Sequence, residues 1–388
     1  MQLYKHQKKA LELTKLKNRC AYYLDMGLGK TFVASEKMLD LNENLNIIVC
    51  PKSVVDTWEN HIKIYYSEYQ VFKYELPKEF LNKNVVIVNY DLIWRRPEFK
   101  QLKDYTLILD ESQFIKNSTA SRTKFIMKLD FKNLILLSGT PTGGKYEELL
   151  TQCHLLGWNI TKKAFWNMYI DYILIPINGF RTPKILGYKN VEHLKQRLNQ
   201  YGAVFMKTEE AIELPEQIDN VIKIENTKEY KQFNKDRIVT VDKLLVGDTS
   251  LTKLLYLRQL ASQYNKNKLQ ALKDLIESTN DRLIIFYNFN EEREQITKLT
   301  DKHLSIISGD MKDLTHYETI DNSVTLVQYQ AGATGVNLQK ANKVIYYSLP
   351  LSSELFEQSK KRIHRIRTKK QLHVLLLNYR KFNRRKNI

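Results

Sequence analysis

The chain has 388 residues, more than one hydrophobic core usually serves, so two domains are expected. Its 61 basic and 43 acidic residues give a formal charge of +18, which favours a polyanionic partner such as nucleic acid. The three cysteines lie far apart, which argues against a disulfide or zinc framework, and no apolar run could span a bilayer or form a signal peptide. These features predict a soluble, non-secreted protein, cytoplasmic or nucleoid-associated, with no membrane partner.

A glycine-bearing turn near the N-terminus has the composition of a phosphate-binding loop. The segment Leu24–Thr31 lies between an apolar run and a helical pattern at Phe32–Leu41. A strand, a glycine turn and a helix N-terminus in this order direct amide N–H groups and a helix dipole at an anion. In such loops the lysine reaches the β- and γ-phosphates and the hydroxyl binds Mg²⁺, roles that fall to Lys30 and Thr31. Only Gly29 is in register with the general motif, so a glycine-rich turn with a surface lysine is the alternative.

Further apolar strands follow, each ending in polar residues. We expect them at Asn46–Cys50, Val85–Asn89, Tyr105–Leu109 and Leu134–Leu137. The carboxyl ends of parallel strands are where α/β proteins bind ligands, and Lys52 and Ser53 follow the first of these strands directly.

Two adjacent carboxylates follow the strand at Tyr105–Leu109. Beside a phosphate loop, one such carboxylate holds Mg²⁺ and the next polarises the attacking water, roles we assign to Asp110 and Glu111. A solvated strand end is the alternative. Ser138–Pro141, at the end of the last strand, would sense the state of the nucleotide; alone it would be an ordinary turn.

The domain boundary is predicted where Leu214 and Pro215 interrupt a helical pattern. Residues 1–213 would form a first lobe, which binds ATP and carries a helical insertion at about 146–205. The aromatic residues of that insertion are expected to pack rather than stack on bases. Residues 214–388 would form a second lobe, with a helical segment at about 227–278.

The second lobe repeats the alternation of strands and helices. Its strands are expected at Leu283–Phe286, Leu304–Ile307, Val324–Gln328, Val344–Tyr347 and His373–Leu377. Two such series predict two parallel-sheet domains. Arg362 and Arg365 lie three residues apart on a predicted helix, hence on one face. An arginine presented across an interdomain cleft can neutralise charge that develops on a γ-phosphate.

These stretches, taken in order, resemble the Swi/Snf-like family of helicase superfamily 2, whose members are DNA-dependent ATPase motors. In the first lobe, the segments that resemble nucleotide-binding motifs of the family are Leu3–Gln7 (the adenine-reading glutamine motif), Asp25–Thr31 (the phosphate loop) and Asp110–Gln113 with Ile115–Asn117 (the carboxylate motif). The segments that resemble its DNA-contacting motifs are Ile48–Pro51 with Trp58 and then Asn89–Tyr90. Ser138–Pro141 resembles the coupling motif. The second lobe carries the resemblance in Leu257–Gln259, Ile284–Phe286, Gly332–Leu338 and Arg362–Ile366.

The resemblance implies an α/β fold of two tandem RecA-like domains, each a parallel sheet flanked by helices, with helical protrusions between them. It implies catalytic roles for Lys30, Glu111, Arg362 and Arg365, and ATP contacts at Gln7, Gly27, Leu28, Gly29, Lys30, Thr31, Asp110, Gly335 and Gln358. Mg²⁺ would be held by Thr31 and Asp110. DNA would contact Lys52, Ser53, Trp58, Asn89, Tyr90, Gly332 and Thr334.

The activity implied is a DNA-dependent ATPase that translocates along duplex DNA without sequence preference. One alternative is a strand-separating DNA or RNA helicase of the same superfamily, which the Gly139–Pro141 and Arg362–Ile366 stretches disfavour. The other is a non-catalytic DNA-binding scaffold, which the presence of Lys30, Glu111 and Arg365 disfavours. The sequence does not identify a protein partner.

Overall fold

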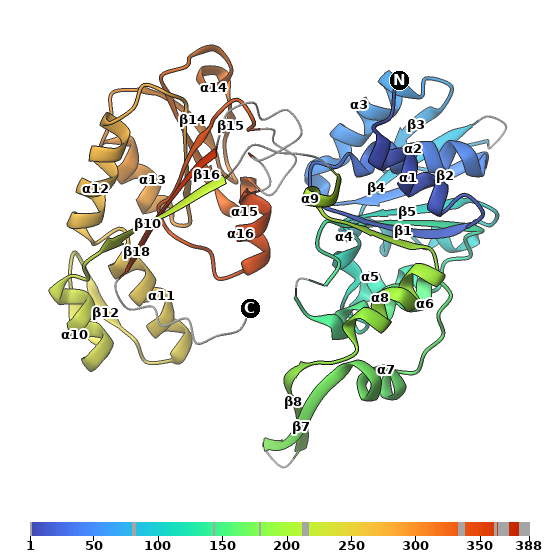
Figure 1. Cartoon of the computed structure of the whole chain (residues 1–388), viewed down its shortest axis with the longest axis horizontal. Helices are drawn as coiled ribbons and strands as arrows, with labels where there is room; N and C mark the ends of the chain where they lie inside the picture. The colour runs from blue at the N-terminus through green and yellow to red at the C-terminus, as the bar shows by residue number, and fades with distance from the viewer. Residues whose placement is uncertain are drawn as a thin grey trace. The chain divides into compact units, whose positions relative to one another are not determined.

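The computed structural model describes residues 2–79, 83–142, 144–177, 180–211, 217–332, 338–360, 363 and 372–379. The chain divides into two compact units, Met1–Glu213 and Leu214–Ile388 (Figure 1). None of the helices in these ranges combines the length and hydropathy that crossing a bilayer requires.

Unit 1 is built on a seven-stranded sheet in the order β3-β4-β2-β5-β6-β1-β9, in which every pairing is parallel. Its strands are β1 (Arg19–Leu24), β2 (Leu45–Cys50), β3 (Gln70–Lys73), β4 (Asn84–Asn89), β5 (Thr106–Asp110), β6 (Asn133–Leu137) and β9 (Ala203–Met206). All six residues of both β2 and β4 are buried. Parallel sheets covered on both faces carry such continuous Ile and Val runs, which explains the sequence pattern.

Helices cover both faces of this sheet because alternate strand residues point to opposite sides. Tyr22 packs in one apolar cluster and Tyr23 in the other. The first cluster includes α1 (Lys5–Leu13), α2 (Lys30–Leu41) and α3 (Val55–Tyr65). The second includes α4 (Tyr90–Ile93), α5 (Ser121–Ile126), α6 (Leu150–Leu155), α7 (Lys162–Tyr169) and α8 (Val191–Gln200). Shorter elements complete the unit: α9 (Thr208–Ala211), η1 (Lys52–Val54), η2 (Pro97–Gln101), η3 (Ser112–Ile115) and η4 (Tyr146–Leu149).

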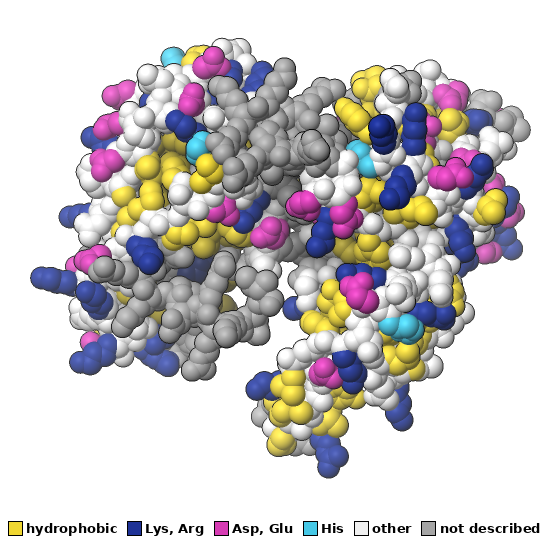
Figure 2. Space-filling view, viewed as in Figure 1, with side chains coloured by type: hydrophobic (Ala, Val, Ile, Leu, Met, Phe, Trp, Pro, Cys, Tyr) yellow, Lys and Arg dark blue, Asp and Glu magenta, His cyan; other side chains and the backbone are white. Residues whose placement is uncertain are grey.

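The predicted helical insertion at about 146–205 needs correction, because it also contains strands. An antiparallel hairpin of β7 (Ile170–Ile177) and β8 (Phe180–Tyr188) follows α7, and β9 joins the edge of the main sheet. The Ile-rich, β-branched sequence of β7 favours a strand over a helix. Apolar and basic side chains gather on this hairpin (Figure 2); its exposed apolar residues include Ile173, Leu174, Phe180 and Leu186.

The aromatic residues that precede the hairpin pack as expected. Trp158, Phe165 and Tyr169 are buried in the second cluster.

Unit 2 holds a second seven-stranded sheet, in the order β10-β18-β17-β13-β16-β14-β15. Its strands are β10 (Gln217–Ile224), β13 (Leu283–Tyr287), β14 (His303–Ile307), β15 (Lys312–Asp313), β16 (Ser323–Gln328), β17 (Lys343–Tyr346) and β18 (Leu372–Tyr379). The pairing of β14 with β15 is antiparallel and the others are parallel.

Alternate residues of β13 again enter two apolar clusters, one on each side of the sheet. The helices of this unit are α10 (Lys228–Asp236), α11 (Ser250–Ala261), α12 (Lys266–Glu277), α13 (Asn290–Thr297), α14 (Thr315–Thr319), α15 (Tyr329–Gly332) and α16 (Ser353–Lys360). The segment predicted as helical at about 227–278 also includes a short hairpin of β11 (Ile238–Thr240) and β12 (Leu244–Val246).

Each unit therefore has the parallel-dominated sheet flanked by helices of a RecA-like α/β domain, and the predicted fold class is confirmed. The strands expected from the sequence form at the predicted places, with ends that differ by one or two residues.

Candidate nucleotide-binding site

The predicted phosphate loop connects β1 to α2. Its backbone is left-handed at Gly27 (φ 88°) and at Gly29 (φ 75°), a conformation that only glycine adopts without strain. A Cβ at Gly29 would also collide with the side-chain amide of Gln7. The loop then runs into Lys30, where α2 begins, so the strand, turn and helix N-terminus follow in the predicted order. The first N–H groups of a helix lack intrahelical partners, so this end can bind an anion.

The Lys30 ammonium lies within the curve of this loop. Its Nζ donates to the carbonyl oxygens of Leu24 (3.0 Å) and Asp25 (3.4 Å). The turn after β6 approaches it closely, since a Cβ at Gly139 would lie 3.3 Å from Lys30 Nζ. Lys30 thus sits where the ends of β1 and β6, which are neighbours in the sheet, meet.

Helix α1 packs against the loop through two buried polar side chains. Gln7 Nε2 donates to the Leu28 carbonyl oxygen at 3.2 Å, and His6 Nε2 lies 3.0 Å from the same oxygen. Gln7 Oε1 accepts a hydrogen bond from Tyr4 N at 2.9 Å. These contacts fix the loop, while the adenine-reading role of Gln7 stays a prediction. The Leu28 side chain is fully buried, so only its backbone can face a ligand.

The two predicted carboxylates lie at the end of β5, next to β6 in the sheet. Asp110 Oδ2 accepts a hydrogen bond from Trp58 Nε1 (2.8 Å), and Oδ1 accepts one from Glu111 N (3.0 Å). Burial raises the pKa of the Asp110 carboxyl to about 6, and the charge of Glu111 acts in the same direction. The Trp58 hydrogen bond and the Lys30 charge lower that pKa. Lys30 and Asp110 therefore face the same edge of the sheet.

Glu111 is held by the segment that follows it. Its backbone is left-handed (φ 53°), which is uncommon outside glycine. Its Oε2 accepts a hydrogen bond from Gln113 Nε2 at 3.0 Å, and Gln113 Oε1 accepts one from Ser138 Oγ at 2.8 Å. The carboxylate is thus linked to the turn after β6, which also approaches Lys30.

Such a site fits a known family. Residues 6–270 match the family model of the SNF2-related domain, and residues 267–367 match that of the helicase conserved C-terminal domain. The chain belongs to the SNF2-related family.

Relatives of this SNF2-related chain include a protein named as an ATP-dependent helicase/translocase and one named as a regulator of chromatin. A Bacillus subtilis protein named as an ATP-dependent helicase/translocase (YwqA) is 25% identical over 410 residues, which cover 90% of this chain and 43% of that protein. A second relative comes from Caenorhabditis elegans and is 22% identical over 467 residues, which cover 91% of this chain and 46% of that protein. It is named as a homolog of the SWI/SNF-related matrix-associated actin-dependent regulator of chromatin subfamily A containing DEAD/H box 1. The chain thus spans less than half the length of both relatives.

Among solved structures, the Sulfolobus solfataricus SWI2/SNF2 ATPase core in complex with dsDNA is similar, with a TM-score of 0.48 and 18% identity. That match covers 97% of this chain and 88% of the other.

Three residues of the SNF2-related chain that we predicted to contact DNA have buried side chains that bond within the protein, and their role in DNA contact stays a prediction. Trp58 is 2% exposed and donates to Asp110. Tyr90 is 1% exposed and donates its hydroxyl to the Asp110 backbone oxygen at 2.9 Å. Asn89 is 4% exposed and caps α4, since its Oδ1 accepts from the amides of Asp91 and Leu92. The buried hydrogen bonds of Trp58 and Tyr90 hold Asp110 in place, and that of Asn89 holds the start of α4.

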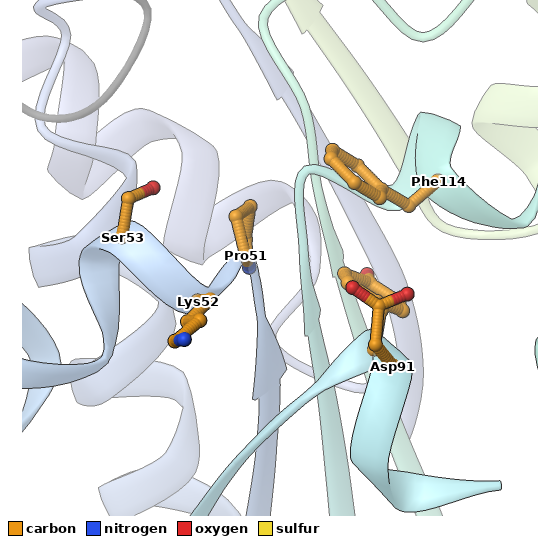
Figure 3. A pocket seen from close by; sticks show the side chains of 6 residues that line it. Pro51, Lys52, Ser53, Asp91 and Phe114 are labelled. Atoms are coloured by element: carbon orange, nitrogen blue, oxygen red, sulfur yellow. The ribbon is translucent and has the colours of Figure 1, made fainter. Parts of the chain in front are cut away.

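Lys52 and Ser53 are exposed, as a DNA contact requires. They lie on one side of an open pocket of about 440 Å³, and Asp91 and Phe114 lie on the other (Figure 3). Pro51 and Tyr90 complete its lining.

The wall of this pocket contains an aromatic residue that the sequence did not single out. The Phe114 ring, 39% exposed, stacks on Tyr90 with centroids 5.1 Å apart. The Arg122 guanidinium lies 5.6 Å from the Phe114 centroid and 3.5 Å from Asp91 Oδ1. The sequence could have pointed to Phe114, because it is an aromatic residue that directly follows the predicted carboxylate motif Asp110–Gln113.

The second unit holds the remaining predicted residues. Gly332 ends α15, and Gln358 lies half-buried on α16. Thr334, Gly335, Arg362 and Arg365 lie outside the described residues. The roles of all six stay predictions.

Proposed function

We propose that the chain is a motor that hydrolyses ATP when bound to DNA and uses that energy to move along duplex DNA. The observation that carries the proposal is the placement of Lys30 in the phosphate loop beside Asp110 and Glu111, at one edge of one sheet. Phosphoryl transfer requires this combination of a phosphate cradle, a metal-binding carboxylate and a group that orients water.

The ATP phosphates would bind to the loop amides at Gly27 and Gly29 and to the Lys30 ammonium. Thr31, half-buried in the first turn of α2, and Asp110 would hold Mg²⁺, which prefers oxygen ligands completed by substrate phosphates. With a pKa of about 6, Asp110 is mostly ionised at neutral pH and available as a ligand. When bound, Mg²⁺ supplies charge neutralisation at the β- and γ-oxygens.

Glu111 would orient the attacking water and accept its proton. The hydrogen bond from Gln113 restricts its carboxylate to one orientation, which lowers the entropic cost of aligning the water. Arg362 and Arg365 would neutralise charge on the γ-phosphate, a role that rests on the sequence alone.

DNA would bind along the carboxyl edge of the unit 1 sheet. Lys52 and Ser53 offer a cation and a hydroxyl to the phosphate backbone, and Phe114 offers an exposed ring. The charge of +18 supports a polyanionic partner. Contacts to phosphates carry no base information, so binding would be independent of sequence.

Phosphate release measured with and without duplex DNA tests this proposal. We expect duplex DNA to stimulate turnover, and its affinity to fall steeply as salt rises from about 50 to 200 mM. Lys52→Ala should weaken DNA binding and reduce the slope of log K against log salt by about 1, with kcat at saturating DNA unchanged.

The matched control is Lys128→Ala, because Lys128 is exposed and lies in the connection from α5 to β6, at the opposite edge of the sheet. Its DNA affinity and salt slope should equal those of the wild type. Turnover without nucleic acid, or equal stimulation by RNA, would contradict the proposed function. If Lys52→Ala had the same salt slope as the wild type, Lys52 would not be part of the DNA-binding surface.

A further inference from the structure

A fully buried glutamine on α6 joins three segments of the candidate site. Gln152 Oε1 accepts hydrogen bonds from the Tyr23 hydroxyl and from Ser112 Oγ, both at 2.8 Å. Its Nε2 donates to the carbonyl oxygen of Pro141 at 3.2 Å. The Gln152 and Ser112 side chains are 0% exposed and Tyr23 is 4% exposed, so water does not compete with these bonds.

The three partners lie in or just after three neighbouring strands of the sheet. Tyr23 lies in β1, just before the phosphate loop. Ser112 follows Glu111 after β5, and Pro141 lies in the turn after β6 that begins at Ser138. Gln152 therefore connects the lysine-bearing loop, the carboxylate segment and the turn between them.

The carboxylate segment needs such external support. The left-handed backbone of Glu111 is strained for a residue with a Cβ, and it persists only where the surroundings hold it. One cross-link to the turn after β6 runs from Glu111 through Gln113 to Ser138. The second runs from Ser112 through Gln152 to Pro141, so the two segments are joined at two points.

We propose that Gln152 is a positioning residue that fixes Glu111 relative to Lys30 and the Ser138–Pro141 turn. The inference rests on the proposed function, since Glu111 is the residue whose placement it controls. Gln152 itself is buried and would touch neither ATP nor water. It acts through Ser112 and Pro141.

Gln152→Met keeps the side-chain length and removes both the acceptor and the donor. We expect kcat at saturating ATP and DNA to fall about 10-fold or more, because small displacements of an orienting group cost rate steeply. The KM for ATP should stay within about 2-fold of the wild type, since Lys30 and the loop amides contact the phosphates before reaction. Ser112→Ala should lower kcat in the same way, and the double variant should lose little more than either single variant.

Cys153→Ala is the matched control, because Cys153 is the next residue on α6 and is also fully buried, in the apolar cluster. It should lower the melting temperature and leave kcat at the wild-type value. A kcat for Gln152→Met equal to that of Cys153→Ala, or a rise in KM alone, would overturn the inference.

Amide hydrogen exchange provides a readout that does not depend on turnover. In Gln152→Met, residues 111–116 and 138–142 should exchange faster than in the wild type, whereas Cys153→Ala should not accelerate these two segments selectively. Unchanged exchange there would overturn the inference even in a protein that hydrolyses ATP. If the wild-type protein did not hydrolyse ATP but Gln152→Met still exchanged faster in these segments, the result would count against the proposed function and support the structural role of Gln152.

Discussion

Glu111→Gln should lower ATP turnover about 10³-fold while ATP remains bound. The substitution keeps the shape of the side chain and an acceptor for Gln113, but removes the negative charge that orients water and takes its proton. The ground-state contacts to the phosphates are made by the loop and not by Glu111, so nucleotide affinity should hold or rise. Single-turnover phosphate release and equilibrium binding of a fluorescent ATP analogue measure the two quantities separately.

Lys30→Ala is the informative comparison, because it should also stop turnover but for a different reason. The Lys30 ammonium lies in the phosphate loop, where it would contact ATP before reaction. Its loss should therefore weaken ATP affinity as well as rate. If both variants lost affinity equally, the division of roles between Lys30 and Glu111 would be wrong.

Trp58→Phe should shift the acid limb of the pH–rate profile to higher pH. In the wild type, turnover should fall as pH drops through about 6, because protonated Asp110 cannot hold Mg²⁺. The Trp58 Nε1 hydrogen bond stabilises the ionised carboxylate, so its removal raises the pKa of Asp110 further. A hydrogen bond to a charged group contributes about 1.5–3 kcal/mol, so the shift should be about one pH unit or more. The profile of kcat/KM for ATP, recorded at limiting Mg²⁺, measures it.

Tyr90→Phe separates this effect from general damage to the buried site. Tyr90 is also buried and also donates to Asp110, but to its backbone oxygen rather than to its carboxylate. The variant should therefore lose stability without moving the acid limb. If the acid limb shifted equally in both variants, or did not shift in Trp58→Phe, Asp110 would not be the group whose protonation limits turnover.

Local patterns in the sequence were sufficient for much of this fold. Central strands such as β2 and β4 are continuous Ile and Val runs bounded by polar residues, and they form where expected. The predicted phosphate loop follows the apolar strand β1, and Asp110 and Glu111 lie at the end of the apolar strand β5, so the sequence could single them out. Their roles stay predictions. Edge strands such as β3 and β10 carry weaker patterns, since they are short or only half-buried, and the sequence did not reveal them.

The supporting residues of the site depend on contacts that no local pattern contains. Trp58 belongs to a stretch that resembles a DNA-contacting motif, yet the fold turns its side chain inward to a carboxylate 52 positions away. Gln152 bonds to Ser112 and Tyr23, which lie 40 and 129 positions away in the chain. Sequence spacing cannot show such pairings, because they depend on which strands become neighbours in the sheet.

Displacement of a third strand from duplex DNA tests the central claim most directly. A labelled oligonucleotide bound as a triplex lies in the path of any protein that moves along the duplex. The wild-type chain with ATP should release this strand and leave the duplex intact, whereas Glu111→Gln, or the wild type without ATP, should release none. DNA-stimulated phosphate release without displacement of the third strand, or separation of the two duplex strands, would contradict the account.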